Sequence, residues 1–205
     1  MSVKIGINGF GRIGRMVLRS IIENSRTDIE IVAINNRSNS EVSSFLLTHD
    51  TVHGFLKNKI NYSDNLITID EKKINMIQES EISNINWAKY NVDIVLECTG
   101  KFNSIEKSSQ HIKSGAKKVL VSAPCRGAPS IVFGVNQKNI NSKDKIISAA
   151  SCTTNCLAPV AKVINENFKI EQGFMTTIHS YTTDQRLLDN SHKDLRRARA
   201  ATNSM

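Results

Sequence analysis

The stretch that decides the fold is Gly6-Ile7-Asn8-Gly9-Phe10-Gly11-Arg12-Ile13-Gly14-Arg15. It holds the pattern G-x-G-x-x-G, between a short apolar strand predicted over residues 3–8 and an amphipathic helix predicted over residues 11–25. In that context small glycines let the backbone approach a pyrophosphate, and the N-terminus of the helix offers it free N–H groups. The stretch therefore predicts a dinucleotide site, to which Arg12 and Ile13 contribute backbone amides.

Strand-like and helix-like segments continue to alternate after this loop. The polar, Asn-rich residues 58–86 predict a short antiparallel excursion with loops. Strands that alternate with helices are typical of a parallel sheet. We therefore expect an α/β fold, with a Rossmann-type parallel sheet domain over residues 1–150. Its further buried strands are predicted over residues 30–35, 92–97 and 118–122, with a helix over about residues 105–114.

The pattern changes after residue 150. Ser151-Cys152-Thr153-Thr154-Asn155-Cys156 follows an apolar segment and leads into a helix that runs through Asn167. Residues 174–179 then predict a strand. We place a domain boundary near residue 150.

The composition is that of an ordinary soluble globular protein. Of the 205 residues 40% are hydrophobic and 22% charged, with only 10 Gly and 3 Pro, which excludes disordered and collagen-like chains. No apolar run approaches the roughly 20 residues that span a bilayer, and the N-terminus has no apolar signal core. We expect a cytoplasmic protein that does not bind membranes.

The net charge is +8, from 27 Lys and Arg against 19 Asp and Glu. The lysines are scattered, and the densest basic cluster, residues 193–199, has no interleaved aromatic residue on which bases would stack. Most of these side chains are typical of a solvated helix face. We expect this cluster to serve a small anion such as phosphate, and we expect no nucleic-acid partner.

Cys152 is the candidate nucleophile among the four cysteines. It starts the predicted helix, whose dipole stabilises a thiolate, and His179 ends the next predicted strand. A Cys–His pair is the usual means of activating a thiol. Taken alone, each residue also fits a structural role: Cys152 fits a buried structural cysteine, and His179 fits a hydrogen-bonded loop histidine. Cys98, Cys125 and Cys156 are expected to be small buried hydrophobes, and the spacing gives no metal site.

Three motifs resemble those of phosphorylating glyceraldehyde-3-phosphate dehydrogenase. They are the glycine stretch 6–15, the stretch Ser151-Cys152-Thr153-Thr154-Asn155-Cys156-Leu157-Ala158-Pro159, and the stretch His179-Ser180-Tyr181-Thr182-Thr183-Asp184-Gln185. Shorter matches extend the resemblance over the whole chain. It implies an oxidoreductase of glycolysis and gluconeogenesis. Cys152 would attack the aldehyde of D-glyceraldehyde 3-phosphate, His179 would act as acid and base, and phosphate would cleave the thioester to give 1,3-bisphosphoglycerate.

The resemblance also implies which residues hold the phosphates and the cofactor. The substrate phosphate and inorganic phosphate would be held by Ser151, Thr153, Thr182 and Arg196. NAD would be lined by Arg12, Ile13, Thr99 and Ser122.

Four further positions bear on the choice between NAD and NADP. Asn36 stands where NAD-using members usually carry Asp, which would repel a 2′-phosphate, and Arg37 can pair with that phosphate. Ser80 aligns with the adenine loop, and Ser191 stands where NAD-specific members often have Pro. We therefore expect dual or NADP-leaning specificity.

Two rival functions stay open at this point. Erythrose-4-phosphate dehydrogenase shares the fold and the Cys–His chemistry, although Tyr181-Thr182 favours the triose enzyme. A non-catalytic nucleotide-binding protein is the other rival, although Cys152 and His179 are both intact. Members of the family are longer, so we expect residues 151–205 to be the start of an α+β catalytic domain whose remainder is missing. We expect the chain alone to be inactive and the full-length protein to be a homotetramer.

Overall fold

The computed structural model describes residues 2–203. Two compact units, residues 1–163 and 164–205, divide the chain inside its last long helix. The strands are β1 (Val3–Asn8), β2 (Ile29–Asn35), β3 (His49–Asp50), β4 (Gly54–Phe55), β5 (Ile60–Ser63), β6 (Leu66–Ile69), β7 (Lys72–Ile77), β8 (Ile94–Glu97), β9 (Lys118–Val121) and β10 (Ile146–Ser148). The helices are α1 (Arg12–Glu23), α2 (Ser40–Thr48), α3 (Ile105–Lys113) and α4 (Cys152–Phe168), with short 3-10 turns η1 (Ile82–Asn84), η2 (Trp87–Tyr90), η3 (Gln137–Asn139), η4 (Leu195–Arg197) and η5 (Ala201–Asn203).

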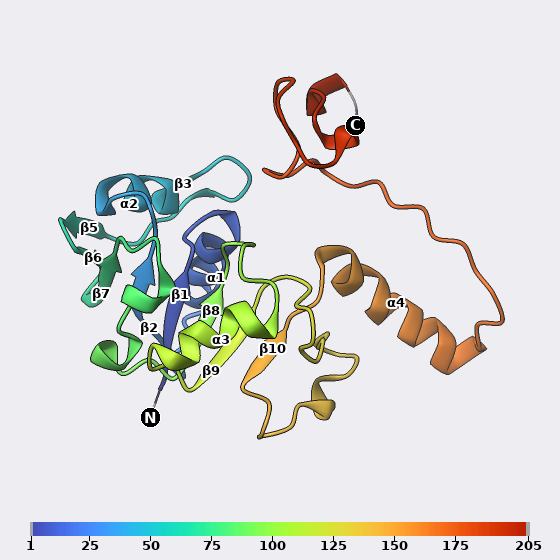
Figure 1. Cartoon of the computed structure of the whole chain (residues 1–205), viewed down its shortest axis with the longest axis horizontal. Coiled ribbons are helices and arrows are strands. Elements are labelled where there is room, and N and C mark those ends of the chain that lie inside the picture. Colours follow the sequence, from blue (N-terminus) through green and yellow to red (C-terminus); the bar gives the residue numbers. More distant parts are fainter. Residues whose placement is uncertain (1, 204–205) are drawn as a thin grey trace. The chain divides into compact units, whose positions relative to one another are not determined.

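The first unit is built on an eight-stranded sheet with the strand order β10-β9-β8-β1-β2-β7-β6-β5 (Figure 1). Neighbouring strands from β10 to β7 are parallel, and β6 pairs antiparallel with both β7 and β5. From β1 the chain builds one side of the sheet through β2 and later crosses to β8 on the other side. The carboxyl ends of β1 and β8 therefore flank a topological switch point, which is where open parallel α/β sheets hold their ligands.

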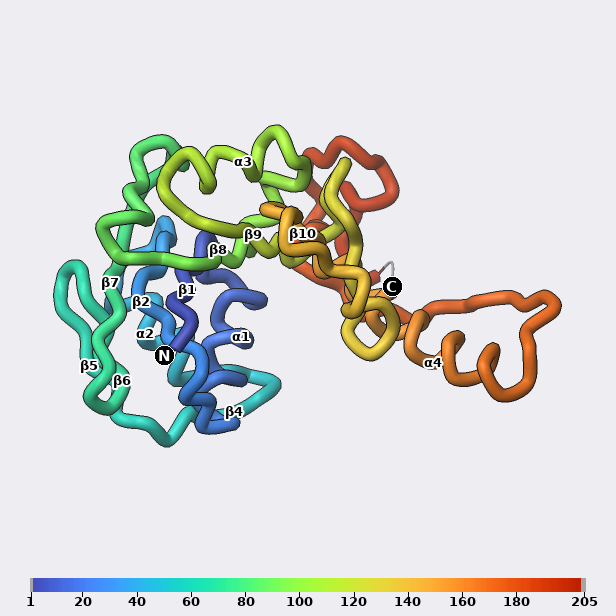
Figure 2. The backbone as a smooth tube through the Cα atoms, turned by 90° about the horizontal axis from the view of Figure 1, so that it is seen from below, coloured from blue at the N-terminus to red at the C-terminus, as the bar shows by residue number. Residues whose placement is uncertain are grey.

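Helices cover both faces of this sheet because its central strands are apolar on both faces. Figure 2 shows α3 on one face and α1 and α2 on the other. Ile7 and Ile34 pack with Leu18 of α1 in one buried cluster, and Val95 packs with Trp87 in a second cluster. Strands that are buried on both faces are typical of parallel sheets.

The helix starts differ in how their first N–H groups are satisfied. The side chain of Asn39 accepts the N–H of Val42 at the start of α2, and that of Ser104 accepts the N–H of Lys107 at the start of α3. The N-cap of α1 is Gly11, which has no side chain, and the first turn of α1 contains no acidic residue. The first N–H groups of α1 are therefore available to another acceptor.

Most of the predicted elements are confirmed. The predicted strands at residues 3–8, 30–35, 92–97 and 118–122 are β1, β2, β8 and β9, and the three predicted helices are α1, α3 and α4. The polar excursion contains the antiparallel strands β5, β6 and β7. Unlike a separate hairpin, it joins the main sheet, because β7 also pairs in parallel with β2.

The strand predicted over residues 174–179 is wrong. These residues have no secondary structure and no strand partner among the described residues of the second unit. The side chains of Phe174 and Ile178 are fully exposed. A strand forms only where a neighbour takes up its backbone N–H and C=O groups, and apolar residues in the segment do not supply that neighbour.

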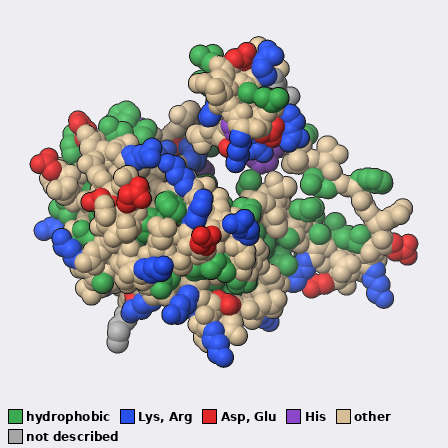
Figure 3. Space-filling view, in the orientation of Figure 1, with side chains coloured by type: hydrophobic (Ala, Val, Ile, Leu, Met, Phe, Trp, Pro, Cys, Tyr) green, Lys and Arg blue, Asp and Glu red, His purple; other side chains and the backbone are tan. Residues whose placement is uncertain are grey.

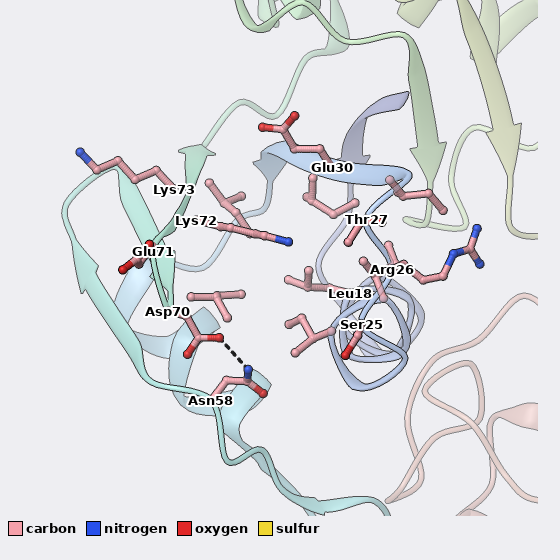
Figure 4. A pocket seen from close by; sticks show the side chains of 16 residues that line it. Leu18, Ser25, Arg26, Thr27, Glu30, Asn58, Asp70, Glu71, Lys72 and Lys73 are labelled. Atoms are coloured by element: carbon pink, nitrogen blue, oxygen red, sulfur yellow. Dashed lines mark hydrogen bonds between the residues drawn. The ribbon is translucent and has the colours of Figure 1, made fainter. Parts of the chain in front are cut away.

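A cavity of about 890 Å³ lies between α1, β2 and the strands β6 and β7 (Figure 4). Leu18 lies on its α1 side, and Lys72 and Lys73 lie on its β7 side. Asn58 donates from Nδ2 to Asp70 at its rim, over 2.7 Å. The cavity borders the amino ends of β2 and β7, so it is separate from the switch point at their carboxyl ends.

Candidate functional site

The glycine loop, residues 9–14, joins β1 to α1 at the switch point, and two of its glycines leave no room for a side chain. Gly9 has φ +91°, and a Cβ on it would lie 2.8 Å from the backbone nitrogen of Thr99. A Cβ on Gly14 would lie 2.3 Å from the carbonyl oxygen of Gly9. A Cβ on Gly11 would meet nothing within 4 Å and would fill open space at the N-terminus of α1. This open cradle at an uncapped helix N-terminus fits a pyrophosphate.

Arg12, the first residue of α1, reaches to Asp50 of β3. Its guanidinium donates from Nη1 to Oδ2 of Asp50 over 2.5 Å, and its side chain is 43% exposed. The other carboxylate oxygen of Asp50 accepts the backbone N–H groups of His53 and Val52. The His53 N–H, assisted by Arg12 and the Val52 N–H and opposed by burial, lowers the pKa of Asp50 to about 2. Ile13, the next residue of α1, is exposed beside this pair.

The residues predicted to determine the specificity for NAD or NADP follow β2 and β7. Asn36 is half-buried and donates from Nδ2 to the hydroxyl of Ser43 over 3.2 Å. Arg37 is exposed and has no ion-pair partner within residues 2–203. Ser80 is exposed in the loop that follows β7. An exposed guanidinium thus stands directly after Asn36, at the carboxyl end of β2.

Thr99 and Ser122 follow β8 and β9, on the other side of the switch point. Thr99 donates its backbone N–H to Oε1 of Glu97 over 2.7 Å and its hydroxyl to the same oxygen over 2.5 Å. The N–H of Ser122 donates to the backbone carbonyl of Glu97 over 3.0 Å. Glu97 therefore holds both predicted cofactor residues on this side.

The sequence reasoning missed the buried polar residues behind these loops. Asn8, Asn35 and Glu97 are the last residues of β1, β2 and β8, and they are 2%, 6% and 1% exposed. Buried polar side chains need hydrogen-bond partners, so three of them at adjacent strand ends must be linked to one another or to neighbouring groups. The signal present in the sequence was a polar residue closing each of three apolar strands.

Cys152 is the first residue of α4, and it is exposed. The hydroxyl of Ser151 accepts the N–H of Thr154 over 3.0 Å and so caps the helix. The chain reaches Ser151 through Ala150, whose φ of +58° is uncommon for a residue with a Cβ. The N–H of Ala150 donates to the hydroxyl of Ser148 over 3.0 Å and helps to hold this turn. The turn presents the thiol at a helix N-terminus, an environment that favours the thiolate.

The other cysteines differ from one another. Cys125 is buried, Cys98 is half-buried, and burial raises the pKa of Cys98 to about 11. The predicted burial of Cys156 is wrong, because this residue is exposed. Its exposure follows from its helix, since α4 has no buried residue. Thr153, which follows Cys152 in the same first turn, is half-buried.

Two predicted residues of the second unit lie in its extended N-terminal part. His179 is exposed, and its Nδ1 lies 2.6 Å from the backbone carbonyl of Ser180. Thr182 donates its N–H and its hydroxyl to Oε1 of Gln185, over 2.7 and 3.0 Å. These contacts form a local turn around Thr182.

The basic cluster of the second unit is paired with aspartates. Arg196 donates from Nε and Nη2 to the two oxygens of Asp194, over 3.1 and 2.9 Å. Ser191 is exposed, and its backbone N–H donates to Asn190. In the first unit the Lys and Arg side chains stand in several separate groups on the face that Figure 3 shows. The predicted helix face at residues 193–199 is instead the short turn η4 with aspartate partners, and its binding of a phosphate stays a prediction.

The first unit brings most of the predicted site residues to one edge. The strands β1, β2, β7, β8, β9 and β10 are mutually parallel, so the residues after their carboxyl ends share that edge of the sheet. These residues are Arg12, Ile13, Asn36, Arg37, Ser80, Thr99, Ser122, Ser151, Cys152 and Thr153. The predicted residues His179, Thr182, Ser191 and Arg196 belong to the second unit, so their approach to Cys152 or to a cofactor stays a prediction.

Two general features of the described chain bear on the site. Within residues 2–203 no group of three or more His, Cys, Asp or Glu is arranged to hold a metal ion. None of the helices in that part of the chain combines the length and the apolar character needed to cross a membrane.

Comparison with known proteins gives two matches to family models. The model described as "Glyceraldehyde 3-phosphate dehydrogenase, NAD binding domain" matches residues 3–105, and the model of the C-terminal domain of the same enzyme matches residues 151–205. Similar proteins include the glyceraldehyde-3-phosphate dehydrogenases of Mycoplasma pneumoniae (50% identical over 98% of this chain and 59% of that protein) and Cereibacter sphaeroides (51% over 100% and 61%). The enzyme of Geobacillus stearothermophilus is 49% identical over 100% of this chain and 61% of its own length. The chain spans about three-fifths of the length of these curated relatives.

Proposed function

The chain belongs to the glyceraldehyde 3-phosphate dehydrogenase family, and we propose that it supplies the cofactor domain and the catalytic thiol of an oxidoreductase. The proposed reaction converts D-glyceraldehyde 3-phosphate and inorganic phosphate into 1,3-bisphosphoglycerate with reduction of NAD(P), a step of glycolysis and gluconeogenesis. The observation that carries the proposal is the exposed thiol of Cys152 at the N-terminus of α4. It stands at the same sheet edge as the open glycine cradle, so that a nucleophile and a dinucleotide site share one edge.

Cys152 begins the proposed reaction as a thiolate. Its sulfur attacks the aldehyde carbon, a C–S bond forms, and the carbonyl oxygen takes up the negative charge. The N-terminus of α4 stabilises first the thiolate and then the oxyanion. His179 takes the thiol proton, gives it to that oxygen and later removes it again as a base. Bound NAD(P) would supply the hydride acceptor that turns the thiohemiacetal into a thioester.

The release step needs a second anion beside Cys152. Inorganic phosphate attacks the thioester carbon, and the C–S bond breaks to return the Cys152 thiolate. We assign Ser151, Thr153, Thr182 and Arg196 to the two phosphate sites. Ser151 and Thr153 flank the thiol in the first turn of α4, and the planar fork of Arg196 suits bidentate contact with a phosphate.

Turnover of variants at two cysteines tests this function. In a protein that carries the complete catalytic domain, we expect Cys152→Ala to abolish the phosphate-dependent reduction of NAD(P) by D-glyceraldehyde 3-phosphate. Cys156→Ala is the matched control, because Cys156 is also an exposed thiol, one turn later in the same helix, and we expect it to keep wild-type turnover. Turnover that survives in Cys152→Ala, or that is lost equally in both variants, would exclude the proposed role of Cys152.

We further propose that the dinucleotide site at the switch point, called the cofactor crevice below, accepts NADP as well as NAD. The five residues that directly follow β2, residues 36–40, include no carboxylate, although an acid there would bind the ribose 2′-hydroxyl and repel a 2′-phosphate. Asn36 and the exposed guanidinium of Arg37 stand there instead. The hydroxyls of Ser80 and Ser191 are proposed as further partners of the 2′-phosphate, Ser191 from a neighbouring subunit.

Two substitutions after β2, made in a protein that carries the complete catalytic domain, test the cofactor preference. Asn36→Asp adds a carboxylate of nearly the same shape, so we expect a lower kcat/KM with NADP and an equal or higher value with NAD. Arg37→Ala is expected to lower kcat/KM with NADP alone. A wild-type protein that strongly prefers NAD, with a preference that neither substitution changes, would refute NADP binding.

The proposal includes a cytoplasmic homotetramer of the full-length protein. Its support is the family membership, and the tetramer would let Ser191 reach the cofactor site of a neighbouring subunit. The mass in solution, measured by light scattering, tests the tetramer, and a monomer at working concentration would contradict it.

A further inference from the structure

Glu97 is the centre of a buried hydrogen-bonded network. Its side chain is fully buried at the carboxyl end of β8. Oε2 accepts Nδ2 of Asn8 over 2.6 Å and Nε2 of His111 over 2.9 Å. Oε1 accepts the N–H and the hydroxyl of Thr99 over 2.7 and 2.5 Å. Four donors converge on two oxygens, which suits a carboxylate, because that group only accepts hydrogen bonds.

The direction of the network is fixed on the side of α3. The indole Nε1 of Trp87 can only donate, and it donates to Nδ1 of His111 over 3.1 Å. Nδ1 therefore carries no proton, and Nε2 carries the proton that is donated to Glu97. Both His111 and Trp87 are 0% exposed, so water does not offer an alternative arrangement.

The direction is also fixed on the side of β2. Oδ1 of Asn35 accepts the N–H of Glu79 and its Nδ2 donates to the carbonyl of Glu79, each over 2.9 Å, so this amide has one orientation. Nδ2 of Asn35 donates in addition to Oδ1 of Asn8 over 2.8 Å. Nδ2 of Asn8 must then face Glu97. Every hydrogen-bond partner of the Glu97 side chain is thus a donor, and both oxygens of Glu97 must accept.

The network links the loops to which the cofactor residues are assigned. Asn8 precedes the glycine loop, Asn35 precedes Asn36, and Glu79 precedes Ser80. Glu97 itself holds Thr99 by two hydrogen bonds. One connected set of buried side chains therefore reaches four loops, which follow β1, β2, β7 and β8.

We infer that Glu97 is a positioning residue of the cofactor crevice, whose buried carboxylate sets the spacing of these four loops and the orientation of Thr99. A glutamine at this position has nearly the same shape but presents an NH2 group either to the two donors of Thr99 or to Asn8 and His111. Donors would then face each other in a buried site, and at least one link would break. The inference rests on the proposed function only in requiring that the crevice binds NAD(P).

The test compares Glu97→Gln with Asp93→Asn in the full chain. Asp93 lies directly before the amino end of the same strand, where it accepts the backbone N–H of Lys4 over 2.9 Å and Nζ of Lys117 over 2.6 Å. Both substitutions turn a hydrogen-bonded carboxylate into an amide, and only that of Glu97 lies at the cofactor edge. Calorimetric titration with NAD gives the Kd, and thermal unfolding gives the Tm of each variant.

We expect Glu97→Gln to raise the Kd for NAD at least about tenfold, which is about 1.4 kcal/mol of binding free energy, because a buried link is lost or reversed. Asp93→Asn is expected to lower the Tm and to leave the Kd within about twofold of wild type. A folded Glu97→Gln variant with the wild-type Kd would overturn the inference. Equal increases of the Kd in both variants would show a general structural role and would also overturn it.

The fluorescence of Trp87, the sole tryptophan of the chain, reports on the network separately from the stability of the fold. Its emission should change in folded Glu97→Gln, because in either orientation of the amide the negative charge beside His111 is lost, and should stay unchanged in Asp93→Asn. Unchanged emission in folded Glu97→Gln would contradict the assigned link from Glu97 through His111 to Trp87.

Asn35→Ala keeps the test decisive if Glu97→Gln does not fold. This variant keeps Glu97 and its four donor groups, and it removes the hydrogen bonds of Asn35 to Asn8 and to the backbone of Glu79. It should fold and should raise the Kd by a smaller factor, and a wild-type Kd would count against the inference. A wild-type chain that binds no NAD would refute the proposed function instead.

Discussion

Asp50 couples the start of α1 to the turn after β3, and its charge is part of that link. Its side chain is 3% exposed and accepts two backbone N–H groups as well as the guanidinium of Arg12. The folded protein lowers its pKa from 3.8 to about 2. A carboxyl group with a lowered pKa stabilises the fold fully above its ordinary pKa of about 4, and this contribution is lost as the pH falls toward 2.

Asp50→Asn should therefore lower the free energy of unfolding at pH 7. The difference from wild type should shrink between about pH 4 and pH 2, where the wild-type carboxylate is protonated. Urea denaturation at a series of pH values measures this difference. A difference that is constant over that range, or that grows toward pH 2, would show that the charge of Asp50 does not stabilise the fold.

The two thiols of α4 should differ in reactivity although both are exposed. Cys152 is at the helix N-terminus and Cys156 is one turn inside, so the thiolate is favoured at Cys152. We expect iodoacetamide to label Cys152 several-fold faster, as followed by peptide mass spectrometry at neutral pH. Equal rates would favour a non-catalytic nucleotide-binding protein.

Local patterns predicted some single residues and not others. Cys152 at a helix start is a local property, and the structure confirms that place. The burial of Cys156 depends on what covers α4, so the sequence around it could not decide the matter. The network of Glu97 was missed because its partners Asn8 and Trp87 come from distant parts of the sequence and follow no periodic pattern.

At the scale of elements, two glycines of the same loop should have separable effects. Gly14→Ala places a Cβ 2.3 Å from the carbonyl of Gly9, so we expect a loss of about 1–3 kcal/mol in the free energy of unfolding. Gly11→Ala meets no protein atom within 4 Å but fills the open cradle. It should nearly keep the stability and raise the Kd for NAD.

Chemical denaturation and calorimetric titration of both variants measure these two effects. Gly11→Ala serves as the control for Gly14→Ala, because both add one methyl group to the same loop. If Gly11→Ala binds NAD with the wild-type Kd, the pyrophosphate does not occupy this cradle.

The elements of the sheet could be predicted where their pattern is local. The alternation of apolar strands with helices predicted β1, α1, β2, β8, α3 and β9. The parallel pairing of β7 with β2 was not predicted, because it joins segments about 40 residues apart. The local pattern around β7 indicates only its antiparallel pairing with β6. Residues 174–179 show the reverse case, in which a strand-like pattern has no neighbour with which to pair.

For the whole molecule, the contrast between the packed sheet and the exposed segment after α4 predicts where a protease cuts. No backbone hydrogen bond joins residues 171–178 to another residue of the described chain. Phe168 is 80% exposed and Phe174 is fully exposed. We expect limited chymotrypsin digestion to cut first after Phe174, which lies inside this segment, as measured by the masses of the products.

Phe133 is the internal control for this digestion, since it is 85% exposed but lies in a hydrogen-bonded turn of the first unit. The N–H of Val132 donates to the side chain of Asn136, and the N–H of Ile131 donates to the carbonyl of Ser148. Cleavage after Phe133 should therefore be slower. Cleavage that begins at Phe133 would contradict the assigned difference between the two regions.

The central place of β1 has a consequence for the order of events during synthesis. Asn8 and its partner Glu97 are 89 residues apart in the chain. At a synthesis rate of roughly 5–20 residues per second, about 4 to 18 seconds pass between the appearance of the first and the second. During that interval β1 has one free edge, and the buried polar group of Asn8 lacks its acceptor. The nascent chain can therefore form the β2 side of the sheet early, while the cofactor crevice has to wait for β8 to leave the ribosome.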